Sequence, residues 1–203
     1  MLTWFLTNLA PWLPMSPLEV TATVFGLLSV WYSVRENIWS WPTGLVNVAL
    51  YIALFWSGKL YAETCLQVIY VVLQIYGWWQ WARGGDRHAG VVITRTSLRL
   101  WLVLLGIAVP LTLMIEQILV RWTDSTTYWW DSISTALSLI AQWMLSKKKL
   151  ENWLIWIIVD CFSIPLFLTK GFYLTGGLYA IFLILCIIGL RAWLRTYRSS
   201  IAG

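Results

Sequence analysis

The chain contains an internal repeat, in which residues 18–82 align without gaps with residues 130–194. Identical residues recur along the whole block, among them Trp31 and Trp143, Trp41 and Trp153, Gly77 and Gly189, and Trp81 and Trp193. Matches of tryptophan and glycine are more informative than matches of leucine or valine in a sequence this apolar. Two homologous halves joined by one further hydrophobic segment are typical of membrane transporters, which bind substrate between their repeats.

The composition is that of a protein embedded in a lipid bilayer. Hydrophobic residues make up 60% of the chain and charged residues 11%, and the mean hydropathy is +0.72. This leaves too little polar surface for a soluble domain. Several apolar stretches approach or reach the roughly 20 residues that a helix needs to cross the hydrocarbon core. They predict seven transmembrane helices, at about 18–34, 41–57, 61–82, 98–120, 128–146, 152–168 and 172–194.

The basic residues predict the orientation of these helices. Eleven of the fourteen lysines and arginines fall on one side of the expected membrane, mainly in the 83–97 connection, at Lys147–Lys149 and near the C-terminus. By the positive-inside rule that side is cytoplasmic, which places the C-terminus inside and, with seven spans, the N-terminus outside. The distribution accounts for the net charge of +5 without a nucleic-acid partner.

The order of the spans predicts the topology. Because a single span at 98–120 separates two blocks of three, both blocks cross the membrane in the same direction. We therefore expect an all-helical membrane protein with two parallel three-helix repeats and a linker helix, the 3+1+3 arrangement that resembles SWEET sugar transporters. The expected segments are an N-terminal interfacial segment at 1–17, repeats at 18–82 and 128–194, a cytoplasmic loop at 83–97, the linker at 98–120 and a cytoplasmic tail at 195–203.

Asp160 lies near the middle of the sixth expected span, where an unpaired carboxylate costs at least about 2.5–3.5 kcal/mol. The only basic residues within the expected spans, Arg99 and Arg191, lie near their cytoplasmic ends, so no fixed cation is evident as a partner. A mobile cationic ligand, a proton or a hydrogen-bonding amide remains. The position therefore favours a binding site over a packing role.

The first repeat supplies polar side chains for the other wall of such a site. They are Asn47 in the second span and Gln67, Tyr70 and Gln74 in the third. Asn47 falls one residue from Asp160 in the internal alignment, so both halves carry a polar group at corresponding depth. The alternative is that these side chains hydrogen-bond between helices as packing contacts, worth about 0.6 kcal/mol each.

Two tryptophans precede Asp160 on one face of the same span, because Trp153 and Trp156 are spaced i, i+3. A planar cation between them would gain about 2 kcal/mol or more of cation–π energy once desolvated. Packing or membrane anchoring is the alternative, but the nearby acid favours binding. Asp131, at the outer start of the fifth span, is a weaker candidate because a carboxylate there also stabilises a helix N-terminus.

Several classes of function find no support in the sequence. It contains no phosphate-binding loop and no hydrolase or zinc-protease motif, and the three cysteines and the single histidine, His88, show no metal-ligand spacing. We therefore expect no enzyme activity, no catalytic residues, no metal site and no cofactor.

Five segments carry a family resemblance: GLVN at 44–47, LYAETCLQ at 60–67, IYGWWQW at 75–81, WDS at 130–132 and ENWLIWIIVD at 151–160. Through them the chain resembles the PnuC-type vitamin transporters, which import nicotinamide riboside and have relatives that carry thiamine. The resemblance implies facilitated diffusion across the bacterial inner membrane, a cytoplasmic kinase that traps the substrate by phosphorylation, and a homotrimer.

The resemblance also implies ligand-binding roles for Trp153, Trp156 and Asp160, with Asn47 and Gln67 at matching positions. Asp160 departs from the asparagine of the nicotinamide riboside transporter, so thiamine, which is also a cation, is the alternative substrate. Two other classes remain as rivals, a seven-helix receptor and a passive pore. Short loops disfavour the receptor, and flux that saturates with substrate concentration would exclude the pore.

Overall fold

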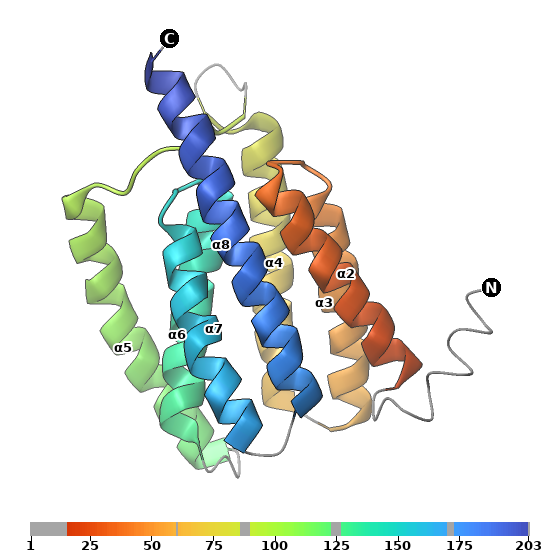
Figure 1. Ribbon diagram of the computed structural model, residues 1–203. Coiled ribbons are helices and arrows are strands. Elements are labelled where there is room, and N and C mark those ends of the chain that lie inside the picture. Colours follow the sequence, from red (N-terminus) through yellow and green to blue (C-terminus); the bar gives the residue numbers. More distant parts are fainter. Residues whose placement is uncertain (1–15, 60, 86–89, 123–126, 170–172, 203) are drawn as a thin grey trace, which may run out of the picture.

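A computed structural model describes residues 16–59, 61–85, 90–122, 127–169 and 173–202. Within these residues the chain forms seven α-helices, which confirms the all-helical architecture (Figure 1). They are α2 (Pro17–Val34), α3 (Ser40–Ser57), α4 (Tyr61–Arg83), α5 (Leu98–Trp122), α6 (Tyr128–Ser146), α7 (Asn152–Thr169) and α8 (Tyr173–Ala202). The expected interfacial segment at 1–17 lies almost wholly outside the described residues, as does His88.

Four of the described helical stretches are long and apolar enough to cross a membrane on their own: Pro17–Val34, Leu98–Trp122, Asn152–Thr169 and Thr175–Ile201 within α8. The helices α3, α4 and α6 are 18, 23 and 19 residues long, which is also close to spanning length. The polar residues Gln74 of α4 and Gln142 of α6 are buried and lower the hydropathy of their helices. Polar side chains of this kind are expected on helices that face the interior of a bundle.

The helices pack in a closed order. Neighbours in sequence lie against each other from α2 to α4 and again from α6 to α8, while α2 contacts α8 and α4 contacts α6. These contacts join six helices into a ring with two seams between the halves of the chain. The seventh helix, α5, packs against α6 and stands on the outside of the bundle (Figure 1).

The turns after α2 and α6 have the same backbone geometry. A basic C-cap residue, Arg35 or Lys147, follows each helix, and the next residue has a positive φ. That residue is Glu36 (φ 54°) in the first turn and Lys148 (φ 46°) in the second, and the two positions are equivalent in the internal alignment. Two side-chain-bearing residues thus adopt a left-handed conformation that most residues avoid.

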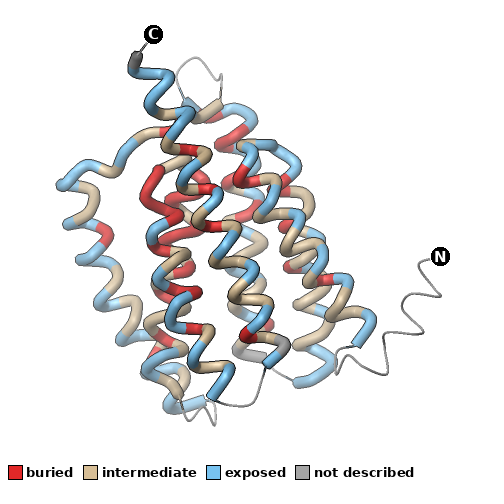
Figure 2. Tube along the Cα trace, in the orientation of Figure 1, coloured by how far each residue is buried: buried red, intermediate tan, exposed pale blue. Residues whose placement is uncertain are grey.

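Buried side chains are concentrated at the end of the bundle that carries the C-terminus, which Figure 2 shows as red segments. The largest apolar cluster lies there and joins the ends of several helices with the segment before α5: Val34, Trp41, Trp81, Ile93, Leu145, Leu150, Trp153, Cys186 and Trp193. At the same end α8 extends beyond its neighbours, so residues 195–202 of the expected tail are helical (Figure 1).

Backbone hydrogen bonds join the segment before α5 to the turn between α6 and α7. The amide of Thr94 donates to the Lys148 carbonyl at 3.1 Å, and the amide of Leu150 donates to the Thr94 carbonyl at 2.9 Å. Beside them, the Glu151 carboxylate accepts hydrogen bonds from the Thr96 amide at 2.8 Å and the Thr96 hydroxyl at 2.7 Å. Burial raises the pKa of Glu151, but these bonds and Arg95 outweigh it and hold the pKa below its ordinary value.

Replacing Glu151 by glutamine should therefore lower the thermal unfolding temperature at pH 7. A carboxyl whose pKa is depressed by folding stabilises the folded state above its unfolded pKa of about 4.3, and the contribution disappears as the pH falls through the folded pKa. The difference in unfolding temperature between the natural protein and Glu151→Gln should thus become smaller as the pH is lowered. Unfolding in detergent at a series of pH values measures it, and a gap that does not depend on pH would contradict this account.

Candidate functional site

Asp160 lies in the middle of α7 with only 3% of its surface exposed. The thiol of Cys186 on α8 lies near its carboxylate. One carboxylate oxygen, Oδ2, is buried and has no hydrogen-bond partner among the described groups. A buried carboxylate oxygen without a donor is costly, and a ligand that brings a cation or a donor would offset that cost.

A tyrosine hydroxyl lies close to this carboxylate. Tyr179 of α8 lies near Ser163 of α7, and near both Asp160 and Tyr51 of α3. The Tyr51 hydroxyl is in turn 3.5 Å from the hydroxyl of Thr23 on α2. Sequence reasoning did not select these four residues, although Ser163 follows Asp160 by three positions and so shares its helical face.

Tyr70 of α4, which the sequence predicted, belongs to the same group. Its hydroxyl lies near Ser138 of α6 and near Tyr179. Tyr70, Tyr179 and Asp160 therefore lie among polar side chains from α3, α4, α6, α7 and α8. We call Asp160, Tyr179, Tyr70, Tyr51, Ser138 and Ser163 the central polar group.

Two predicted amides of the first half each lie over a glycine of a neighbouring helix. Asn47 of α3 donates from Nδ2 to the Ala22 carbonyl at 2.7 Å, and this nitrogen would be 2.9 Å from a Cβ at Gly26. Gln74 of α4 is 8% exposed, and a Cβ at Gly44 would overlap its amide. Because Gly26 and Gly44 have no side chain, they leave the space that the two amides occupy. The Asn47 amide also forms a contact between α2 and α3.

The other predicted residues fall in different surroundings. Trp153 is 2% exposed and packs edge-on against Trp193, with ring centroids 5.4 Å apart, whereas Trp156 is half-buried. Gln67 is also half-buried. Asp131 lies in the first turn of α6 and accepts a hydrogen bond from the Thr127 hydroxyl at 3.0 Å. Their roles in ligand binding stay predictions.

Four tryptophans fill the bundle at the end that carries the C-terminus. Trp41 stands edge-on to Trp81 with ring centroids 5.3 Å apart, and Trp153 has the same relation to Trp193 at 5.4 Å. Trp81 and Trp193 meet at 6.1 Å. In the internal alignment Trp153 corresponds to Trp41 and Trp193 corresponds to Trp81. Below we refer to these residues as the tryptophan quartet.

Hydrogen bonds tie this quartet across both seams. The indole of Trp81 donates to the Leu145 carbonyl at the end of α6 at 3.2 Å, and that of Trp193 donates to the Ser33 carbonyl at the end of α2 at 3.0 Å. Ser33 and Leu145 are themselves equivalent positions of the two repeats. Each half therefore donates one indole bond to the equivalent carbonyl of the other half.

An ion pair joins the halves at the same end. The Lys148 ammonium is 3.0 Å from a Glu36 carboxylate oxygen, and these two residues again occupy equivalent positions of the repeat. The ammonium also lies 4.6 Å above the ring of Trp81. The two side chains are 13% and 26% exposed, so the pair is partly shielded from solvent.

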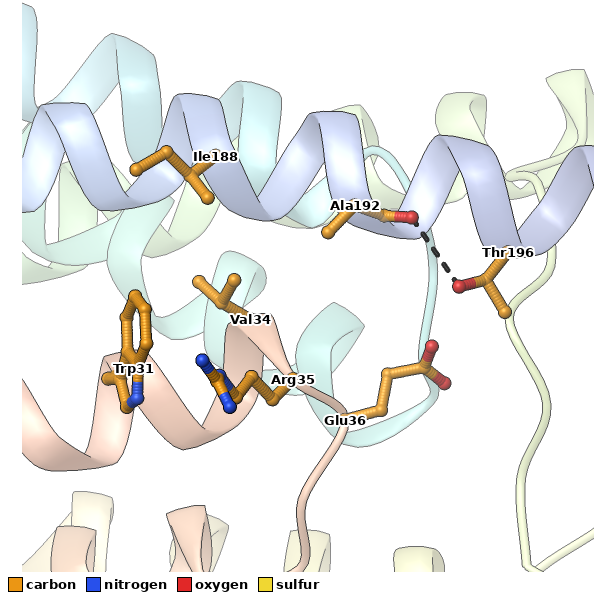
Figure 3. Close-up of a pocket in the computed structure, with 7 residues that line it drawn as sticks. All are labelled: Trp31, Val34, Arg35, Glu36, Ile188, Ala192 and Thr196. Carbon is orange, nitrogen blue, oxygen red and sulfur yellow. Dashed lines mark hydrogen bonds between the residues drawn. The ribbon is translucent and has the colours of Figure 1, made fainter.

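An open groove of about 470 Å³ lies between the end of α2 and α8. Figure 3 shows the residues that line it, which are Trp31, Val34, Arg35, Glu36, Ile188, Ala192 and Thr196. None of them belongs to the central polar group, so we place the candidate ligand site at Asp160. The described residues contain no group of three histidine, cysteine or acidic side chains that could hold a metal ion.

The central polar group has the chemistry of a binding site for a small polar cation. It combines one buried carboxylate with hydroxyl groups that donate and accept hydrogen bonds, and half-buried Trp156 lies one helical turn from Asp160. The amides of Asn47 and Gln74 lie on the first half of the ring. Such a set can bind and orient a charged ring that carries hydroxyl or amide substituents.

Comparisons with known proteins agree on one family. The sequence model of the nicotinamide mononucleotide transporter family matches residues 16–195. The chain is 26% identical over 210 residues to the nicotinamide riboside transporter PnuC of Escherichia coli (strain K12), and the match covers 91% of this chain and 88% of that protein. It is 25% identical over 186 residues to the riboflavin/roseoflavin transporter RibM of Streptomyces davaonensis, with 90% and 87% covered.

A solved structure has the same fold. The crystal structure of the vitamin B3 transporter PnuC superimposes with a TM-score of 0.73 at 24% sequence identity, and the match covers 94% of this chain and 86% of that one. The likeness extends over nearly all of this chain, which includes the described helices.

Proposed function

The chain belongs to the nicotinamide mononucleotide transporter family, and we propose that it carries nicotinamide riboside across the bacterial inner membrane. It is a multi-pass membrane protein and a transporter by family rather than an enzyme. The observation that carries the choice of a cationic substrate is Asp160, a buried carboxylate in mid-helix with one unpartnered oxygen among the described groups. The pyridinium of nicotinamide riboside would supply the missing positive charge.

In the proposed complex the pyridinium ring lies beside Trp156 and near Asp160. The tyrosine hydroxyls of the central polar group and the amides of Asn47, Gln67 and Gln74 are then the donors and acceptors for the ribose hydroxyls and the carboxamide. Trp153 contributes by holding the helix in place through Trp193, and Asp131 lies at the start of α6. Both are less direct candidates for contact with the substrate.

We further propose that the two halves are parallel three-helix repeats, α2–α4 and α6–α8, linked by α5. The exchanged indole bonds of Trp81 and Trp193 and the Glu36–Lys148 pair support this, because each joins positions that the internal alignment makes equivalent, as an approximate twofold axis between the repeats would require. Rocking of the repeats around the ligand gives alternating access. The tryptophan quartet then closes the cytoplasmic side, and release inward requires its indole bonds to break.

The orientation and the physiological setting are part of the same proposal. The basic residues concentrated at the end that carries the C-terminus favour a cytoplasmic location for that end. Facilitated diffusion, phosphorylation of the substrate by a cytoplasmic kinase and assembly as a homotrimer rest on the family resemblance. Each is tested separately from substrate binding.

Thiamine is the alternative substrate, because its thiazolium also carries a positive charge that suits Asp160. Riboflavin, the substrate named for the relative RibM, lacks such a charge and would leave the carboxylate without a cationic partner. We therefore rank it below both cations.

Uptake into proteoliposomes tests the proposal. Labelled nicotinamide riboside should enter vesicles that contain the purified protein, and the rate should saturate with substrate concentration. Excess unlabelled riboside should abolish the signal, whereas excess riboflavin should leave it unchanged. Competition by thiamine and not by the riboside would identify thiamine as the substrate. Flux that never saturates with substrate concentration would indicate a passive pore.

A further inference from the structure

The groove between α2 and α8 combines a basic side chain with an aromatic wall. The Arg35 guanidinium lies 4.6 Å above the centre of the Trp31 ring, which holds the planar cation at the rim of the groove (Figure 3). Stacking of this kind uses the face of the guanidinium and leaves its N–H edge available to donate hydrogen bonds. The edge of Arg35 is therefore suited to bind an anion with several oxygens.

The remainder of the groove is mostly apolar and open. Val34, Ile188 and Ala192 provide apolar surface from both helices, and Trp31 and Ile188 are 38% and 40% exposed. These exposed side chains lie on helices long and apolar enough to cross a membrane, so we expect lipid chains beside them. A ligand here would meet one charged end and one apolar wall.

Arg35 and Glu36 are the two charged residues that line the groove. The Glu36 carboxylate is already paired with Lys148 at 3.0 Å. Arg195 is not part of the lining, but it follows Ile188 by seven residues, which is about two helical turns, and so adds a second cation on the same side of α8. Arg35 and Arg195 thus stand at the end of the helices, where the headgroups of a bilayer begin.

The equivalent position in the other half is different. Lys147 corresponds to Arg35 in the internal alignment and lies 5.2 Å above the ring of Tyr76, which corresponds to Ile188. Trp143, the counterpart of Trp31, packs in the cluster formed by α5, α6 and α7. In the second half, α5 therefore covers the surface around Trp143, whereas the surface around Trp31 in the α2–α8 groove stays open.

We propose that the α2–α8 groove binds an anionic phospholipid, with the phosphate at Arg35 and Arg195 and an acyl chain along Ile188 and Trp31. Basic pockets between transmembrane helices on the cytoplasmic side are suited to acidic headgroups. The bound lipid would bridge the two halves at the seam where Trp193 bonds to Ser33. It would stabilise the packed arrangement of the tryptophan quartet.

Lipid-dependent thermal unfolding of the purified protein in detergent tests this. Phosphatidylglycerol should raise the unfolding temperature, and phosphatidylethanolamine should raise it less. Arg35→Gln should weaken the apparent affinity for phosphatidylglycerol about fivefold, the loss expected for one arginine at an anionic surface, and Arg35→Lys should retain most of it. Arg121→Gln, which removes a basic residue at the opposite end of the bundle on α5, serves as the matched control and should behave like the natural protein.

Three results would overturn the proposal. They are equal stabilisation by both lipids, an unchanged response to phosphatidylglycerol in Arg35→Gln, and full reproduction of the effect by soluble glycerol phosphate, which would identify a free phosphate site instead. If Arg35→Gln fails to fold, Arg195→Gln on exposed α8 makes the same test. Uptake of nicotinamide riboside is measured on the same variants, so a failed lipid effect leaves the transport proposal standing.

Discussion

Replacing Asp160 by asparagine should weaken the binding of nicotinamide riboside by roughly 30-fold or more while leaving the protein folded. The amide keeps the shape of the side chain but removes the charge that faces the pyridinium. Loss of one member of a buried charge pair costs about 2–5 kcal/mol, and about 2 kcal/mol corresponds to this fold-change. Titration calorimetry of the two purified proteins measures the difference.

Two controls isolate the charge. The reduced dihydronicotinamide riboside has no ring charge, so its affinity should differ little between the natural protein and Asp160→Asn. Glu116→Gln changes another buried acid, on α5 outside the ring of six helices, and should bind the cation normally. An unchanged affinity of Asp160→Asn for the cationic riboside would remove Asp160 from the site.

Adding a methyl group at Gly77 or Gly189 should produce the largest loss of stability from a single small substitution. A Cβ at Gly77 would overlap the ring of Trp41, and a Cβ at Gly189 would overlap that of Trp153. Both rings are buried, with 1% and 2% exposed, so neither can move away cheaply. Overpacking of this kind costs about 1–3 kcal/mol per site.

Thermal unfolding in detergent compares Gly77→Ala and Gly189→Ala with two matched glycines. A Cβ at Gly106 on α5 or Gly177 on α8 would meet nothing within 4 Å. Alanine at these positions should be neutral or slightly stabilising, because glycine weakens a helix by up to about 1 kcal/mol relative to alanine. Equal unfolding temperatures across all four variants would mean that the tryptophans are not held as described.

The helices were predictable because hydrophobic length determines them. The span expected at 98–120 is α5 at Leu98–Trp122, and the span expected at 152–168 is α7 at Asn152–Thr169. Composition did not give the C-terminal end of the last helix, since α8 continues through the basic residues from Arg195 onward. Charge ends the apolar run there, but lysine and arginine are good helix formers, so it does not end the helix.

The location of Asp160 within a polar interior was also predictable, because a lone carboxylate in an apolar span demands polar neighbours. The sequence could not separate the two nearby tryptophans. Spacing places Trp153 and Trp156 on one face, yet only the packing of α8 reveals that Trp153 lies against Trp193 while Trp156 stays half-buried. Helical periodicity gives the face of a residue and not the neighbour that covers it.

The hydroxyl groups of the site were missed for a related reason. Tyr179, Tyr51 and Ser163 are ordinary residues in membrane helices, where they also serve as interfacial anchors or packing contacts. Tyr179 and Tyr51 come near Asp160 only through the arrangement of α3, α7 and α8 within the bundle. A search for polar residues three or four positions from the acid would have found Ser163, but not the two tyrosines on other helices.

The measurement that tests the central claim most directly is calorimetric titration of the purified protein with nicotinamide riboside, thiamine and uncharged nicotinamide. We expect saturable binding of the riboside, weak or no binding of thiamine, and none of nicotinamide, because the site requires both a cationic ring and ribose hydroxyls. Binding of thiamine without binding of the riboside would contradict the proposed substrate. Equal binding of nicotinamide and the riboside would contradict the role given to the buried carboxylate.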